Sequence, residues 1–113
     1  MNFNEIPEFS KEFKDKAKKY LSLSRDLEMF RKVISEIPLG NGKHFTIITI
    51  HNTAKIVKAR LFCKYLGKSS FRIIYSYREK ENLIEFLELY FKGDKPNENR
   101  ERIKDYLKSI GKV

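Results

Sequence analysis

The sequence predicts an α+β protein in which an antiparallel sheet of four to five strands carries its helices mainly on one face. Apolar residues recur at helical spacing before residue 38 and after residue 97, whereas β-branched and aromatic runs separated by turn residues fill the segment between. Strands that cluster between helices, without alternating with them, are typical of α+β folds. Because the chain has 113 residues and 41% apolar content, we expect one domain over residues 1–113.

The N-terminal third is predicted to hold a short strand and a helical hairpin. Residues 3–7 fit an edge strand that a proline ends, and this would be the fifth strand of the sheet. Ser10 and Ser24 can each cap a helix. The apolar stripes that follow these two residues extend the helices over residues 10–21 and 24–37.

The middle of the chain is predicted to form the sheet. Three segments rich in β-branched and aromatic residues fit strands, namely 45–50, 55–64 and 71–77. The periodicity of residues 83–91 fits either a strand or a helix, and the hairpin arrangement of the preceding strands favours a strand. A final helix, capped by Asn97, is expected to extend to Ile110.

Positive charge is concentrated in the middle of the chain. From Ile37 to Arg78 there are eight Lys and Arg residues and no Asp or Glu, so this segment carries +8 of the net charge of +9. An ordinary solvated surface mixes both signs, whereas a stretch of one sign attracts polyanions such as nucleic acids. The segment therefore favours a nucleic-acid-binding face over a basic surface without a partner.

The composition disfavours several other classes of protein. The single cysteine, Cys63, excludes a disulfide framework and a Cys-x-x-Cys zinc site, and its spacing indicates a core residue. No apolar run is long enough for a membrane span and no secretion signal is present, so we expect a cytoplasmic protein without a membrane partner. His44 and His51 can each serve as a general base, but they bracket one strand and lie too far apart for a joint site.

Candidate RNA-binding residues follow the strand at 55–64. Alternation places four basic and aromatic side chains on one face of this strand, where they can hold phosphates and stack a base: Lys58, Arg60, Phe62 and Lys64. Lys55 adds a further cation at the start of the strand. The alternative is an ordinary solvated strand face.

Further cations lie on the neighbouring strand and after the last one. Arg72 is the only charged residue within the strand 71–77, and it is expected either to bind phosphate or to pair with Glu85 or Glu88 on the next strand. Lys92 and Lys95 flank Gly93, where the alternative is a solvated loop. Two cations near the final helix, Arg100 and Arg102, are expected to pair with Glu98 or Asp105.

In this order and spacing, the sequence resembles the RelE/ParE superfamily of toxins from type II toxin–antitoxin systems. The resemblance spans nearly the whole chain. It rests on the Phe9-x-x-x-Phe13-Lys14 opening of the helical hairpin and on two central strand motifs, Lys58-Ala59-Arg60 and Phe71-Arg72-Ile73-Ile74-Tyr75. The segment 86–93 resembles the last strand of the family and its exit loop.

The resemblance implies a ribosome-dependent endoribonuclease that needs no cofactor or metal, cuts mRNA in the ribosomal A site and is neutralised by an acidic antitoxin. RelE-like members cut through attack of the ribose 2′-hydroxyl on the adjacent phosphate and rely on Lys and Arg. Carried onto this chain, the resemblance implies four catalytic residues, Arg72, Arg60, Lys58 and Lys95. The four candidate RNA-binding residues are Lys55, Phe62, Lys64 and Lys92. A monomer is one option for the free protein, and the sequence leaves its oligomeric state open.

Two alternatives and one departure accompany this interpretation. The alternatives are a ParE-like toxin that inhibits DNA gyrase by protein contact, and a non-catalytic RNA-binding protein of the same fold. The departure concerns the Tyr or His–Tyr that RelE-like nucleases often place near the C-terminus for proton transfer. This chain has only Tyr90 and Tyr106 in that region, and the second lies on the apolar side of the predicted final helix.

Overall fold

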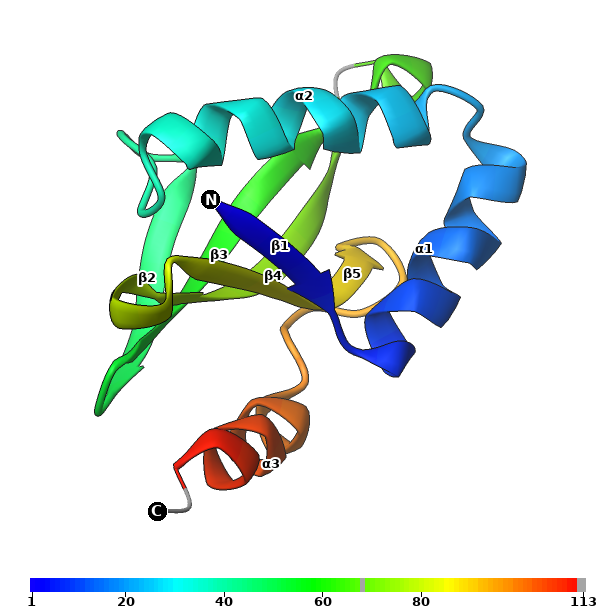
Figure 1. Cartoon of the computed structure of the whole chain (residues 1–113). Helices are drawn as coiled ribbons and strands as arrows, with labels where there is room; N and C mark the ends of the chain where they lie inside the picture. The colour runs from blue at the N-terminus through cyan, green and yellow to red at the C-terminus, as the bar shows by residue number, and fades with distance from the viewer. Residues whose placement is uncertain (68, 112–113) are drawn as a thin grey trace.

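The structure is a computed structural model that describes residues 1–67 and 69–111, so Lys68 of the basic segment lies outside it. Its centre is a five-stranded sheet with the order β1-β5-β4-β3-β2 (Figure 1). The strands are β1 (Asn2–Glu5), β2 (Phe45–His51), β3 (Ala54–Phe62), β4 (Ser70–Arg78) and β5 (Leu83–Phe91). The helices are α1 (Pro7–Lys19), α2 (Leu23–Glu36) and α3 (Arg100–Ile110). The predicted α+β class, helical hairpin and C-terminal helix are confirmed, and residues 83–91 form the strand that was favoured.

The sheet is antiparallel except at one edge. Strands β2 to β5 follow one another as antiparallel neighbours, whereas β1 pairs parallel with β5, along residues 83–86. The prediction of a wholly antiparallel sheet is therefore wrong at β1. Tight hairpin turns force neighbouring strands to alternate in direction, but β1 reaches β5 only through the rest of the chain, so its direction is not constrained in this way.

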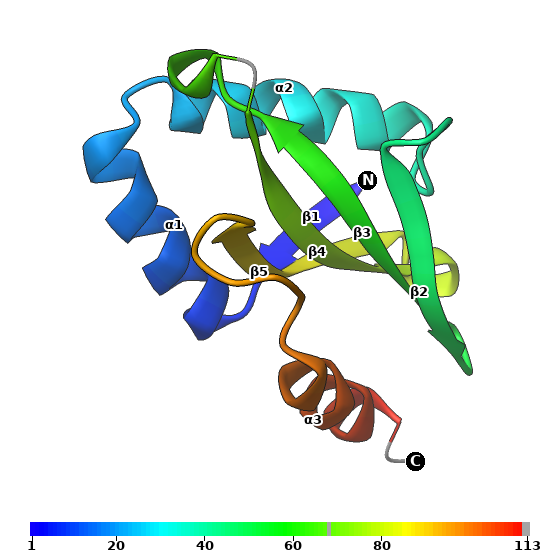
Figure 2. The ribbon, with the colours of Figure 1, turned by 180° about the vertical axis from the view of Figure 1, so that it is seen from behind.

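Helices cover both faces of the sheet. On the face that we call the α1/α2 face, buried side chains of α1 and α2 such as Phe9 and Leu27 pack over alternate strand residues such as Ile73. On the opposite face, the α3 face, Ile103 and Tyr106 pack over a second, smaller apolar cluster. In Figures 1 and 2, α2 crosses the strands and α3 lies away from it. The expectation of one largely free face is therefore wrong, because α3 covers part of it.

A bulge in β5 enables α3 to bind there. The β4–β5 register shifts between Ile74 and Tyr75, whose partners on β5 are Glu88 and Phe86. The extra residue, Leu87, is fully buried in the α3 cluster. A bulge breaks the strict alternation of a strand. As a result, β5 presents both Leu87 and Glu88 to α3, the first for apolar packing and the second as a buried carboxylate.

The helices begin at other residues than predicted. Helix α1 starts at Pro7, three residues before Ser10, because a proline in the first turn loses no helical hydrogen bond. Helix α2 follows Ser22 rather than Ser24. Helix α3 is capped by Asn99, whose side chain accepts the backbone N–H of Arg102 at 3.0 Å. None of the described helices is both long and apolar enough to cross a membrane.

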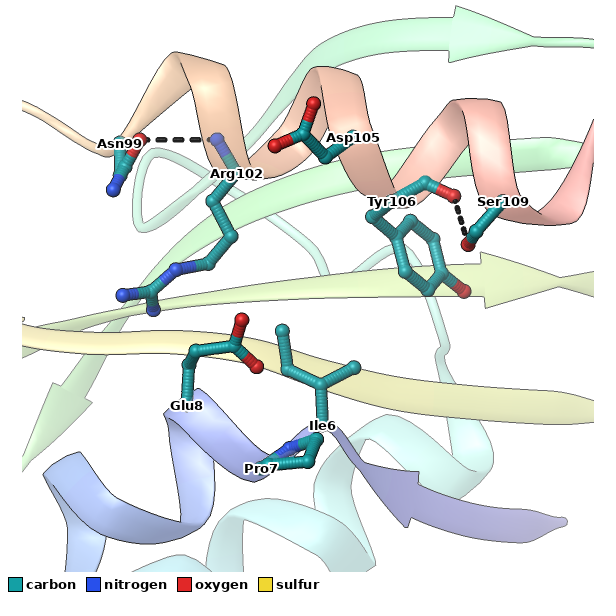
Figure 3. A pocket seen from close by; sticks show the side chains of 8 residues that line it. All are labelled: Ile6, Pro7, Glu8, Asn99, Arg102, Asp105, Tyr106 and Ser109. Carbon is teal, nitrogen blue, oxygen red and sulfur yellow. Dashed lines mark hydrogen bonds between the residues drawn. The ribbon is translucent and has the colours of Figure 1, made fainter.

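An ion pair fixes α3 to α1. The Arg102 guanidinium donates to both carboxylate oxygens of Glu12 at 2.9 Å, and to the carbonyl of Leu87 at 2.9 Å. Burial alone would lower the pKa of Arg102, but the Glu12 carboxylate outweighs it and raises that pKa. Figure 3 shows Arg102 pointing from α3 toward α1, across a pocket of about 400 Å³ that Glu8 also lines. The predicted pairing of Arg102 with its own helix is therefore wrong.

Candidate functional site

Four side chains from neighbouring strands form one row across the α3 face. Arg60 on β3 lies directly opposite Arg72 on β4, and Arg72 lies opposite Tyr90 on β5. The row continues to the residue just before β2, His44, whose carbonyl accepts the N–H of Arg60 at 3.0 Å. Directly opposite residues of adjacent antiparallel strands have Cβ atoms about 4.5–5.5 Å apart, so the row is continuous.

The two arginines of this row face each other without a counter-charge. Among the described residues, neither Arg60 nor Arg72 forms an ion pair. The Nη1 of Arg72 donates to the hydroxyl of Ser70 at 2.9 Å, a neutral partner. The alternative partners of Arg72 are bound elsewhere, Glu85 to Arg78 and Glu88 to Lys95. Like charges placed directly opposite destabilise a sheet, so this arrangement favours an anion between them.

A shallow cleft collects these cations. It has a volume of about 210 Å³ and is lined by Arg60, Ser69, Ser70, Arg72, Phe91, Lys92 and Gly93. No carboxylate is among these lining residues, while guanidinium, ammonium and hydroxyl donors all are. Guanidinium groups bind phosphate oxygens through short charge-assisted hydrogen bonds, often two at a time. The cleft is therefore suited to a phosphate group.

An exposed aromatic side chain lies beside the cleft. Phe62 follows Arg60 by two residues on β3, so both point to the same face, and 54% of Phe62 is exposed. Its ring contacts the His44 ring edge to face, with the centroids 5.2 Å apart. An exposed aromatic ring next to a cationic cleft can stack a nucleic-acid base.

Two of the predicted catalytic lysines are engaged by buried carboxylates. Lys58 Nζ binds Glu98 at 3.0 Å, and Arg100 binds the same carboxylate at 3.0 Å, as predicted for this arginine. Burial would raise the pKa of Glu98, but hydrogen bonds from its backbone and from Lys58, with the charge of Arg100, lower it overall. Lys95 pairs with Glu88, whose side chain is 1% exposed. Both lysines therefore hold the segment before α3 onto the sheet.

Two further predicted residues lie away from the row. Lys55 is opposite Tyr77 and faces the α1/α2 side, in a separate pocket that Glu79 also lines. The predicted strand 55–64 ends at Phe62, and Lys64 belongs to a 3₁₀ turn where its N–H donates to the Asp26 carboxylate at 3.2 Å. The structure thus brings together four predicted residues, Arg60, Phe62, Arg72 and Lys92.

His44 and Tyr90 complete the row but were not predicted to belong to it. Tyr90 is 4% exposed, and its pKa is raised to about 12 by burial and by Glu98 and Glu88, against the opposing effect of Arg72. Its hydroxyl thus stays protonated at neutral pH. The sequence signal for His44 was its place just before a strand that pairs with the Arg60 strand. Tyr90 could not be aligned with Arg72 without knowing the bulge at Leu87.

The sheet with a helical hairpin on one face and a C-terminal helix on the other defines a RelE-like α+β fold. It is similar to a chain in the crystal structure of the archaeal RelE–RelB complex from Pyrococcus horikoshii OT3, with a TM-score of 0.61 and 22% sequence identity. The match covers 81% of this chain and 94% of that chain. No family model matches the sequence, and no curated protein matches it significantly. The predicted RelE/ParE-like fold is thus confirmed, and its function has to be argued from the site.

Proposed function

We propose that this protein is a toxin of a toxin–antitoxin pair and acts as a ribosome-dependent mRNA endoribonuclease. The observation that carries the proposal is the pair of opposed arginines, Arg60 and Arg72, which have no described counter-ion and share a cleft with Lys92. The RelE-like fold supports it, as does the carboxylate-free segment from Ile37 to Arg78.

Cleavage would proceed by attack of the ribose 2′-hydroxyl on the adjacent phosphate. The phosphorane formed in this step carries more negative charge than the substrate, and fixed cations stabilise that charge. Arg72, which donates to Ser70, and Arg60 would bind the phosphate oxygens, while Phe62 would stack a neighbouring base. The products are a 2′,3′-cyclic phosphate and a 5′-hydroxyl. DNA lacks the 2′-hydroxyl and is not a substrate.

The shape of the site explains why the ribosome would be needed. The cleft is shallow, and Arg60 and Lys92 at its rim are exposed, so the protein alone makes few contacts that orient an RNA strand. In-line attack requires close alignment of the reacting atoms, and alignment of this kind supplies a large share of catalysis. The decoding site of the ribosome holds an mRNA codon in a fixed conformation. The proposal therefore includes mRNA in the A site as substrate and the cytoplasm as location.

The proposed protein partner is an acidic antitoxin. The net charge of +9 favours a partner of opposite sign, and the similar archaeal chain was solved in a complex named RelE–RelB. Such a partner would cover the cationic row and block access to RNA. The free toxin is expected to be a monomer, which light scattering of the purified chain can measure.

The test is mRNA cleavage in a translation extract, mapped by primer extension. The wild-type protein should produce cuts at the codon in the A site. Arg72→Ala and Arg60→Ala should each lower the cleavage rate about 10²–10³-fold, the loss typical for one donor to a charged transition state. Arg25→Ala is the matched control, because Arg25 is exposed on α2, and it should cleave like the wild type.

Two other results would redirect the interpretation. Intact mRNA together with a loss of DNA supercoiling in cells would favour the gyrase-inhibiting alternative. Intact mRNA together with tight RNA binding would favour a non-catalytic RNA-binding protein. For that binding, log K should fall with log salt concentration at a slope of about −0.7 for each phosphate neutralised on a single strand, and Arg72→Ala should reduce the slope.

A further inference from the structure

The His44 side chain lies next to the cationic pair. Its chain neighbour Phe45 stacks on Phe30 of α2 with centroids 6.1 Å apart, so Phe45 faces the α1/α2 side. His44 directly precedes β2 and its carbonyl continues the pairing with Arg60, which directs its side chain to the face opposite Phe45, the α3 face. Its contact with the Phe62 ring and its backbone bond to Arg60 agree with this placement.

One ring nitrogen of His44 makes no hydrogen bond within the described part of the fold. Its Nδ1 is buried and makes no hydrogen bond with any described residue. Buried polar atoms are nearly always hydrogen-bonded, so an exception calls for a role in binding or chemistry. His44 bonds to Arg60 through its backbone carbonyl, and its imidazole packs against the Phe62 ring. His44 as a whole is only half-buried, so the ring is held in place while part of it stays open to a substrate.

The proposed reaction needs a group that accepts a proton. Arg60 and Arg72 remain protonated in proteins and cannot accept one. Each nearby carboxylate is engaged by two donors, Glu88 by Lys95 and the N–H of Asn99, and Glu98 by Lys58 and Arg100. The Tyr90 hydroxyl is buried and holds its proton. The imidazole is the remaining member of the row with a nitrogen that can accept a proton.

We propose that His44 is the general base that removes the proton from the attacking 2′-hydroxyl. The inference rests on the proposed nuclease function and deepens it. As the 2′-oxygen bonds to phosphorus, its proton passes to a nitrogen of the imidazole. The bond between phosphorus and the 5′-oxygen then breaks, and the leaving 5′-oxygen takes a proton from solvent water. The imidazolium finally returns its proton to solvent, so the enzyme is unchanged after each cut.

The chain offers a matched control at the far end of β2, the strand that follows His44. His51 is exposed, lies seven residues from His44, and is far from Arg60 because β2 pairs it with Ala54. The charged groups on the elements around His44 are Lys43 in its own turn, Lys58 and Arg60 on β3, Arg72 on β4, and Glu98, which is paired with Lys58. All of these charged groups are present in both the His44 and the His51 variants, so they cannot account for a difference between the two.

The experiment measures the pH dependence of single-turnover cleavage of mRNA on programmed ribosomes. The wild-type rate should depend on pH, because a general base must be unprotonated to act. His44→Gln should lower the rate about 10²–10⁴-fold, the usual contribution of a general base, and should remove this pH dependence. His51→Gln should match the wild type. Added imidazole should partly restore cleavage by His44→Ala.

Binding of an mRNA with a 2′-deoxyribose at the cleavage position separates chemistry from affinity. His44→Gln should bind this uncleavable mRNA on the ribosome within about twofold of the wild type, because a general base contributes to the reaction step. An unchanged rate and pH profile in His44→Gln would overturn the inference and leave the nuclease proposal intact. So would a loss of affinity as large as the loss of rate. A wild-type protein that cuts no mRNA would instead overturn the nuclease proposal itself.

Discussion

Two cations on one strand face should have opposite effects on stability when each is neutralised. Lys58 and Arg60 are two residues apart on β3 and point to the same side of the sheet. Lys58 pairs with Glu98, whereas Arg60 lies opposite Arg72 with no described counter-ion. We therefore expect Lys58→Gln to destabilise the fold and Arg60→Gln to stabilise it. The same substitution in both positions controls for the strand propensity of glutamine.

The magnitudes follow from burial and pairing. Removing one partner of a buried ion pair costs about 3–5 kcal/mol. Here Arg100 still binds Glu98, and the Lys58 side chain is 30% exposed, so screening reduces the expected cost to about 1–2 kcal/mol. Relieving the like-charge contact of Arg60 should add about 0.2–1 kcal/mol to the free energy of unfolding. For a chain of this length, the latter corresponds to a rise in Tm of roughly 1–4 °C.

Thermal and urea unfolding at two salt concentrations provide the assay. The gain from Arg60→Gln should shrink as salt increases, because Arg60 is exposed and the Debye length is about 10 Å at 0.1 M. The loss from Lys58→Gln should persist, since the Glu98 side chain is 2% exposed. If Arg60→Gln destabilises the fold, the two arginines do not repel each other as the structure indicates. The argument for an anion between them would then fail.

Three further predictions concern elements around the site. Arg102→Met should lower the free energy of unfolding by about 2–3 kcal/mol in urea titrations, because it leaves Glu12 without its partner between α1 and α3. Gly40→Ala should lower the free energy of unfolding by about 3 kcal/mol or more, since Gly40 has φ +71° and a Cβ there would lie 2.0 Å from the Phe45 ring. Gly42→Ala, at φ +87° with open space around it, should cost only about 1–2 kcal/mol. Folding lowers the pKa of Glu98, so its ion pairs stabilise the fold above the ordinary glutamate pKa of about 4.3. This stabilisation is lost as the pH falls through the pKa that Glu98 has in the folded protein. The Tm of Glu98→Gln should therefore fall less in acid than that of the wild type.

The sequence predicted elements wherever one strong pattern decided the outcome. The alternation of residues 55–62 and the aromatic strand at 71–77 gave correct strands, because each buries one complete face. Predictions failed where two local signals competed. Ser10 is a good cap, but Pro7 already starts the helix, and the Ser10 hydroxyl instead donates to Glu5 at 2.5 Å. The direction of β1 depends on the path of the whole chain and leaves no local signal.

The site was predictable along a strand but not across strands. Arg60 and Phe62 share a face by alternation alone, which the sequence contains. That Arg72 faces Arg60 depends on the register of the β3–β4 hairpin. The partners of Lys58 and Lys95 depend on how the chain folds back after β5, and no periodicity encodes this contact. The sequence therefore indicated which cations belong to the sheet region but could not show which of them are neutralised.

The position of the acids decides which cations remain free. The segment from Ile37 to Arg78 contains no carboxylate, so any counter-ion for β3 and β4 must come from another part of the chain. Two acids that reach the α3 face are Glu88 and Glu98, and they bind Lys95 and Lys58. Glu88 belongs to β5 and Glu98 to the segment before α3, and among the described residues neither forms an ion pair with Arg60 or Arg72. A substitution that introduces a carboxylate beside the cleft, such as Ser69→Glu, should therefore abolish RNA binding while leaving the fold intact, as circular dichroism can verify.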